Sequence, residues 1–119
     1  MVNISAGVSV IGGSGGLEWK VISVNTNAVT KNGYIINTSG GSVTLTLPSA
    51  PVAGDIIGIA DYNKNFATHN CTIDRNGKNI MGMGENFVCD VNNTNITLIY
   101  TDNTLGWKML SSGNTIDRI

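Results

Sequence analysis

The chain has 119 residues, a length that suits one domain around a single core. Charged residues make up 13% of it and the formal net charge is −1, so it lacks the basic excess that neutralises nucleic-acid phosphates. Because so weak a charge gives little repulsion between copies, the composition indicates assembly. No basic segment followed by an apolar run opens the chain, so we expect no signal peptide, no membrane partner and synthesis in the cytoplasm.

Residues 1–16 are expected to form an N-terminal arm. Val8-Ser9-Val10-Ile11 is a short apolar segment, and Gly12-Gly13-Ser14-Gly15-Gly16 separates it from the domain. Such a glycine-rich stretch allows the arm to move independently. The alternatives are a simple leader and an arm that docks on a neighbouring subunit or particle; we favour docking. The residues expected to contact the partner are Val8, Val10, Ile11, Gly12 and Gly13.

The first half of the domain shows two strand patterns. From Leu17 to Val24, alternate residues Leu17, Trp19 and Val21 share one face, with Trp19 expected as a core anchor. Further on, Val43, Leu45 and Leu47 alternate with polar residues as in a half-buried strand. Between them, residues 33–37 form another strand, and residues 39–41 (Ser-Gly-Gly) predict a hairpin turn.

A central stretch, residues 54–82, organises the rest. Ile56 to Ala60 is apolar throughout, which predicts a central strand buried on both faces. The polar loop from Asp61 to Asn70 has one large apolar side chain, Phe66, which we expect to be folded inward as its anchor. After a strand at residues 71–74, Asn76-Gly77 favours a tight hairpin whose return begins at Ile80.

The C-terminal part predicts more strands. Phe87, Cys89 and Val91 alternate with other residues. Residues 95–101 and 106–110 are expected to pair as a hairpin around a polar turn. With no usable helical window, the prediction is an all-β fold: a single jelly-roll-like β-sandwich of about eight to ten short antiparallel strands. Its expected bounds are residues 17–110, followed by a tail at 111–119.

One loop contains residues that could bind a metal ion. Asp61-x-Asn63-x-Asn65 resembles the start of a calcium loop, but Phe66 stands where glycine is needed and Thr72 where a bidentate glutamate is needed. An Asx-rich loop that bonds its own backbone is favoured. Two cysteines and one histidine, without close spacing, do not make a zinc site. We therefore expect no metal, no cofactor and no catalytic residues.

The cysteines and aromatic residues have two interpretations each. Cys71 and Cys89 are expected to be small buried side chains, with a disulfide as the alternative. Trp19, Tyr34, Tyr100 and Trp107 fall on strands and are expected in the core. An exposed loop with aromatic and amide groups could instead bind sugar by stacking and hydrogen bonding. The residues of that possible ligand-binding loop are Asp61, Tyr62, Asn63, Phe66 and Asn70.

An ordered set of short motifs covers most of the chain, from Trp19 to Leu110. Its members are Gly33-Tyr34-Ile35-Ile36-Asn37-Thr38, Val43-Thr44-Leu45-Thr46-Leu47-Pro48, Gly54-Asp55, Ala60-Asp61-Tyr62, Phe66, Thr72-Ile73-Asp74-Arg75-Asn76-Gly77, Ile80, Gly82, Leu98-Ile99-Tyr100 and Gly106-Trp107. In this set the chain resembles a β-domain of virion structural proteins of tailed bacteriophages, often found in tail fibres and related appendages.

The resemblance implies a trimeric, β-rich, non-enzymatic component of a virus particle. Fibre proteins are long, whereas here the domain follows a short arm, which favours a capsid decoration (cement) protein over a long fibre. The expected partners are other copies of the chain in a homotrimer and virion proteins such as the major capsid protein. The alternative is a tail fibre or appendage module that binds a host receptor or surface glycan.

Overall fold

The computed structural model describes residues 16–112, which form nine strands and no helix. The number of strands agrees with the prediction. The arm residues Val8, Val10, Ile11, Gly12 and Gly13 lie outside the described residues. The strands are β1 (Glu18–Ile22), β2 (Thr26–Asn27), β3 (Asn32–Ile36), β4 (Val43–Thr46), β5 (Ile56–Asp61), β6 (Cys71–Asp74), β7 (Phe87–Cys89), β8 (Asn95–Tyr100) and β9 (Trp107–Ser112).

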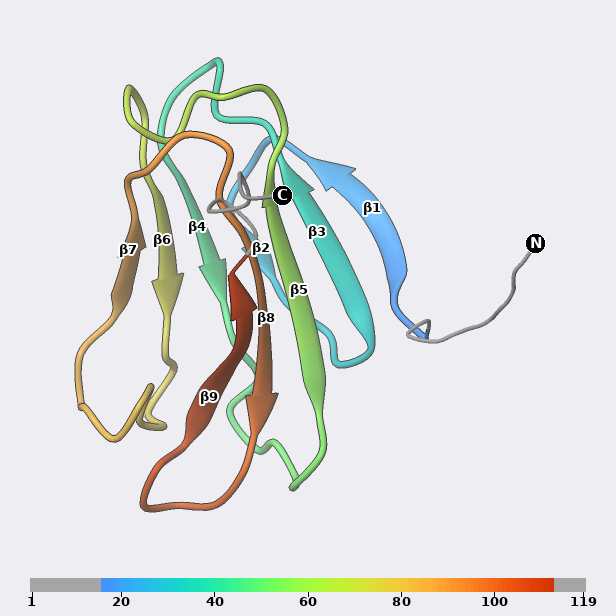
Figure 1. Ribbon diagram of the computed structural model, residues 1–119, viewed down its shortest axis with the longest axis vertical. Helices are drawn as coiled ribbons and strands as arrows, with labels where there is room; N and C mark the ends of the chain where they lie inside the picture. The colour runs from blue at the N-terminus through green and yellow to red at the C-terminus, as the bar shows by residue number, and fades with distance from the viewer. Residues whose placement is uncertain (1–15, 113–119) are drawn as a thin grey trace.

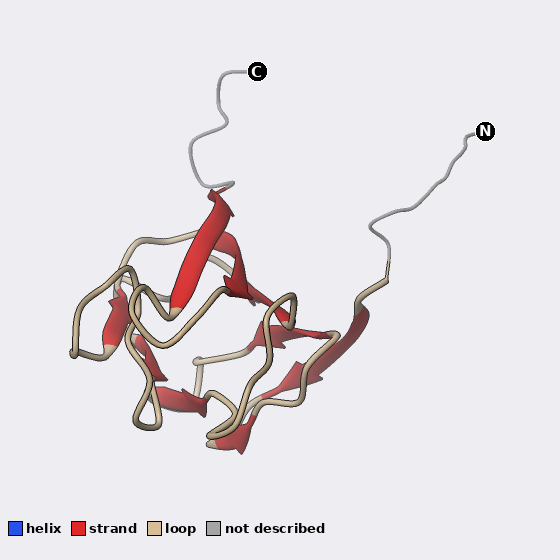
Figure 2. Ribbon diagram, turned by 90° about the horizontal axis from the view of Figure 1, so that it is seen from below, coloured by secondary structure: helices blue, strands red, loops and turns tan. Residues whose placement is uncertain are grey.

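The strands form two sheets that enclose the core between them. One sheet has five strands in the order β1-β3-β5-β8-β9, and the other has four in the order β2-β4-β6-β7 (Figure 1). Figure 2 looks along the strands and shows the two layers on either side of the interior. The predicted all-β fold with two sheets is therefore confirmed, and β5 is the central strand of its sheet, as expected from residues 56–60.

Strand direction differs from the prediction of an antiparallel sandwich. Both sheets are mixed: β1, β3 and β5 run parallel, as do β2, β4 and β6. β7 pairs antiparallel with β6, β8 with β5, and β9 with β8. The cause is that the first six strands alternate between the sheets, so same-sheet neighbours are one full coil of chain apart, as in a β-solenoid. The jelly-roll connectivity is not confirmed.

The turns explain how this alternation arises. The turn at residues 39–41 was predicted to close a hairpin, but it carries the chain from β3 to β4 in the opposite sheet. Asn76 and Gly77 have φ values of 51° and 91°, the left-handed conformation expected for them. The strand before this turn, β6, pairs with β7 at residues 87–89, however, so the returning strand of the hairpin does not begin at Ile80. The hairpin predicted at the C-terminal end is confirmed as β8 and β9.

The core contains the residues that period-two alternation placed there. Val43, Leu45 and Leu47 are all buried, as are the inward residues Ile96, Leu98 and Tyr100 of β8. Tyr34 and Trp107 are also buried, so three of the four aromatic residues predicted in the core lie there. Trp107 packs edge-to-face on Tyr100, with ring centroids 5.4 Å apart and an interplanar angle of 69°.

Trp19 is the fourth aromatic residue, and the prediction that it anchors the core is wrong. Its side chain is 45% exposed on the edge strand β1, on the face of the sheet that points away from the core. The register places Trp19 beside Gly33 and Gly33 beside Gly58. A Cβ atom at Gly33 would overlap the indole, and one at Gly58 would lie 2.7 Å from it. The indole therefore lies flat across two glycines.

Candidate functional site

The loop after β5 is organised by the carboxylate of Asp61. Its Oδ1 accepts a hydrogen bond from the backbone N–H of Asn63 at 3.3 Å. Its Oδ2 accepts three more, from the N–H groups of Asn65 at 2.8 Å, Phe66 at 3.1 Å and Asn93 at 2.9 Å. Asp61 is itself buried. The prediction of an Asx-rich loop that bonds its own backbone is confirmed, and Asp61 also ties this loop to the turn before β8.

Phe66 is the apolar anchor of the same loop. Its side chain is 0% exposed, so it is folded inward as expected. A completely buried ring cannot stack on a sugar, and the prediction that Phe66 belongs to a ligand surface is therefore wrong. Asn70 is also committed to the loop, because its side-chain amide donates to the Phe66 carbonyl at 2.7 Å.

The outer part of the loop keeps two of the predicted ligand residues. Tyr62 is 52% exposed, and the side chain of Asn63 is exposed beside it. His69 contacts the chain itself, since its Nδ1 lies 2.9 Å from the carbonyl oxygen of Thr38. The loop thus presents one aromatic ring and one amide to a ligand, where the prediction had two aromatic rings.

Asp61 should be important for stability because it satisfies so many buried donors. We expect Asp61→Asn to lower the free energy of unfolding by about 2–3 kcal/mol, since the amide places a donor against backbone N–H groups. Asp74→Asn is the matched control, because the Asp74 carboxylate accepts one N–H, from Asn76. Asp74→Asn should lower the free energy of unfolding by less than about 1 kcal/mol. Urea unfolding of both variants measures the difference; equal losses would contradict the role given to Asp61.

The cysteines face each other across β6 and β7. Cys71 and Cys89 are register partners, and both are buried free thiols. The hydrogen bond to Cys89 and burial raise the pKa of the Cys71 thiol above its ordinary value. A thiol that resists ionisation is a poor nucleophile and a poor metal ligand, so Cys71 acts as core packing, and the buried Cys89 packs beside it. Among the described residues, no cluster of three or more His, Cys, Asp or Glu could hold a metal ion.

The two sheets differ sharply on the faces that point away from the core. On the four-stranded sheet this face carries Thr44, Thr46, Thr72 and Asp74, with Val88 at the edge. On the five-stranded sheet it is mostly apolar, and we call it the outer face. Its residues are Trp19, Val21, Gly33, Ile35, Ile56, Gly58, Ala60, Asn95, Thr97, Ile99, Lys108 and Leu110.

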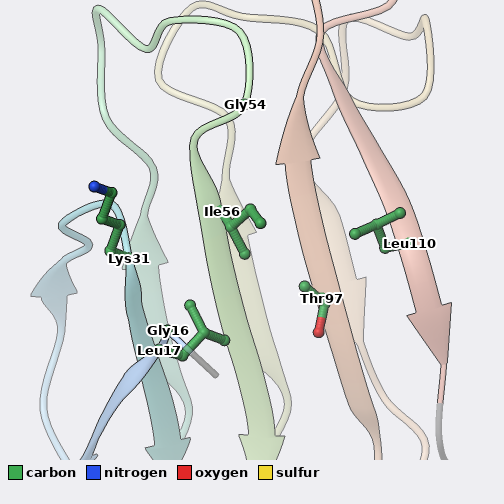
Figure 3. Close-up of a pocket in the computed structure, with 7 residues that line it drawn as sticks. All are labelled: Gly16, Leu17, Lys31, Gly54, Ile56, Thr97 and Leu110. Carbon is green, nitrogen blue, oxygen red and sulfur yellow. The ribbon is translucent and has the colours of Figure 1, made fainter. Parts of the chain in front are cut away.

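A groove of about 640 Å³ lies at one end of the outer face. Leu17, Ile56 and Leu110 give it apolar walls, together with Thr97, while Gly16, Lys31 and Gly54 complete its lining. Figure 3 shows Ile56, Thr97 and Leu110 on the neighbouring strands β5, β8 and β9, with the Lys31 nitrogen pointing away from the other side chains. Gly16, which lines this groove, is the first residue that the structure describes.

Neither the outer face nor the groove was predicted from the sequence. Alternation correctly placed Leu17, Trp19 and Val21 on one side of the strand, but it assigned that side to the core. The available signal was the pair of glycines inside apolar strand segments, Gly33 and Gly58, since a strand glycine often marks a close approach by another group.

Comparisons with known proteins add no family to this description. No protein-family model matches the chain, and the search of curated proteins finds no match. Within residues 16–112, no helix is long and apolar enough to cross a membrane.

Proposed function

We propose that this chain is a structural protein of a bacteriophage particle, a homotrimer that decorates the capsid and clamps neighbouring capsid subunits. The observation that carries the proposal is the outer face, an apolar surface whose exposed members include Trp19, Val21 and Leu110. Contiguous apolar surface of this kind marks a site of protein association. The ordered resemblance to phage virion β-domains supplies the kind of assembly in which such a module occurs.

The proposal divides the work between two parts of the chain. The domain associates with other copies, and the arm, through Val8, Val10 and Ile11, contacts the shell. A protein that binds the assembled shell in preference to free capsid subunits stabilises the shell by mass action. Catalysis has no part in this role.

Co-sedimentation with capsids that lack the protein tests this function. We expect saturable binding by the full chain. Replacing Val8, Val10 and Ile11 together by serine should weaken binding at least about tenfold, because three apolar anchors are lost. The control replaces three exposed valines of the domain, Val24, Val29 and Val52, by serine, and should bind as the natural chain does.

Host cell envelopes are the second binding target in the same experiment. Binding to envelopes and not to capsids would overturn decoration in favour of a receptor- or glycan-binding appendage. Tyr62 and Asn63, the exposed part of the Asp61 loop, would then be the residues to change. Equal binding of capsids by the arm variant and the natural chain would remove the arm from the proposal.

A further inference from the structure

The outer face has the composition of a buried layer. Its only charged member is Lys108, and the apolar side chains on its three inner strands are Ile35, Ile56, Ala60 and Ile99. A sheet face that meets water is ordinarily polar, as the outward face of the four-stranded sheet is in this same chain. Both sheets belong to the same chain, so the difference in polarity between their outward faces does not reflect a general excess of apolar residues. It indicates that the two faces have different surroundings.

Strand sequence strengthens this argument. The parallel strands β4 and β6 alternate apolar with polar residues, as expected for a sheet with one face in water. Parallel strands occur mainly in sheets that are covered on both faces, and they then have nearly continuous apolar sequences. The adjacent parallel strands β3 and β5 fit that description, with Gly33 to Ile36 and Ile56 to Ala60. Their inner residues are covered by the second sheet. On their outer side the Trp19 indole covers Gly33 and Gly58, whereas Ile35, Ile56 and Ala60 are only partly buried.

We propose that neighbouring copies of this chain cover the outer face, so that in the homotrimer the five-stranded sheets of the copies face a common axis. This inference rests on the self-association included in the proposed function, and it identifies the surface involved. Sheets that pack face to face lie about 10 Å apart with interdigitating side chains. Because the Trp19 ring lies flat on Gly33 and Gly58, it does not protrude from the outer face and leaves room for another sheet to pack there.

The size of the outer face favours a second copy over a segment of the same chain. Its five strands of five to six residues cover roughly 20 Å by 17 Å, from the usual strand spacing and rise. Outside the described residues, the apolar run of the sequence is Val8 to Ile11, which is one strand wide and about 13 Å long when extended. It could cover the groove, but most of the face would stay open.

Charge is also consistent with a second copy. The face has no acidic residue, and its positive groups lie near its borders: Lys108 on the edge strand β9 and Lys31 at the groove. A partner recognised through charge would need a charged centre on this face to pair with. An uncharged, apolar centre is instead complementary to another surface like itself.

Val21→Lys is the variant that tests the surface, and Val88→Lys is its matched control. Both are exposed valines on edge strands, 58% exposed at Val21 and 47% at Val88. They differ in location, since Val21 is on the outer face and Val88 is on the outward face of the four-stranded sheet. An added charge is easily hydrated in a single chain, but it must be desolvated in an interface.

Sedimentation velocity of the full chain over a range of concentrations gives the result. We expect the natural chain and Val88→Lys to associate alike, and Val21→Lys to shift the association midpoint at least about tenfold to higher concentration. Leu110→Lys, on the opposite edge strand, should act in the same way as Val21→Lys. Circular dichroism should show both outer-face variants with the strand content of the natural chain, which separates lost association from lost folding.

Three outcomes would overturn the inference. The natural chain could remain a monomer at all concentrations, or both outer-face variants could associate as the natural chain does. The third outcome is that serine at Val8, Val10 and Ile11 abolishes association, which would assign the contact to the arm. Capsid binding is measured separately. A chain that associates through the outer face but does not bind capsids would contradict the decoration function and would still support the outer face as the self-association surface.

Discussion

Trp107→Ala should lower the free energy of unfolding by about 3–5 kcal/mol, the range for truncating a large aromatic residue in a packed core. The side chain of Trp107 is fully buried and packs on Tyr100. Truncation removes that edge-to-face contact and leaves a cavity below the β8–β9 hairpin. Urea unfolding at one fixed protein concentration measures the loss, and the fixed concentration matters because association adds to apparent stability.

Trp107→Phe is the informative companion. The indole Nε1 is buried with no hydrogen-bond partner, so part of the packing energy of Trp107 is offset by a desolvated donor. Phenylalanine keeps a ring beside Tyr100 and removes that donor. We therefore expect a loss of about 1–2 kcal/mol for Trp107→Phe. A Trp107→Ala loss below about 1 kcal/mol would show that the hairpin does not pack on the core in this way.

Sequence alternation located most of the strands, and for residues 43–47 it also identified the buried face. The pattern of Val43, Leu45 and Leu47 is typical of a strand with one apolar side, and the three residues are buried. The apolar run at residues 56–60 likewise predicted a central strand. These features depend on neighbours along the chain, so a local pattern contains the information.

Strand partners could not be derived in the same way. The pattern at residues 43–47 would be the same whether β4 paired with β3 or, as observed, with β2 and β6. The Ser-Gly-Gly turn at residues 39–41 permits a tight hairpin, but it also permits a crossing to the other sheet. Which of these occurs depends on contacts with β6, whose residues lie a whole coil further along the chain.

The Asp61 loop shows the same limit at the level of a site. Its sequence predicted both an inward anchor and an outward aromatic ligand at Phe66, and one side chain cannot fill both roles. The structure assigns the anchor role to Phe66. Asn93, which supplies a fourth N–H to the Asp61 carboxylate, comes from a turn 32 residues away, so no local motif could have included it.

Gly106→Ala should be severely destabilising for two reasons that can be separated. Gly106 has a φ of 76°, a conformation that a residue with a Cβ adopts at a penalty of about 1–2 kcal/mol. In addition, a Cβ atom there would overlap the carbonyl of Asn79, which accepts the backbone N–H of Trp107 at 2.9 Å. Because that obstacle is backbone, relief requires the chain to shift, and we expect a total loss above about 3 kcal/mol.

Gly77→Ala isolates the first of these terms. Gly77 has a similar φ of 91°, but no atom lies within 4 Å of the position its Cβ would take. Gly77→Ala should therefore lower the free energy of unfolding by the conformational penalty alone, about 1–2 kcal/mol. Urea unfolding of the two variants gives the difference, which measures how tightly the turn before β9 is held against residue 79. Equal losses at the two glycines would mean that this close approach relaxes freely and that the hairpin end is loosely packed.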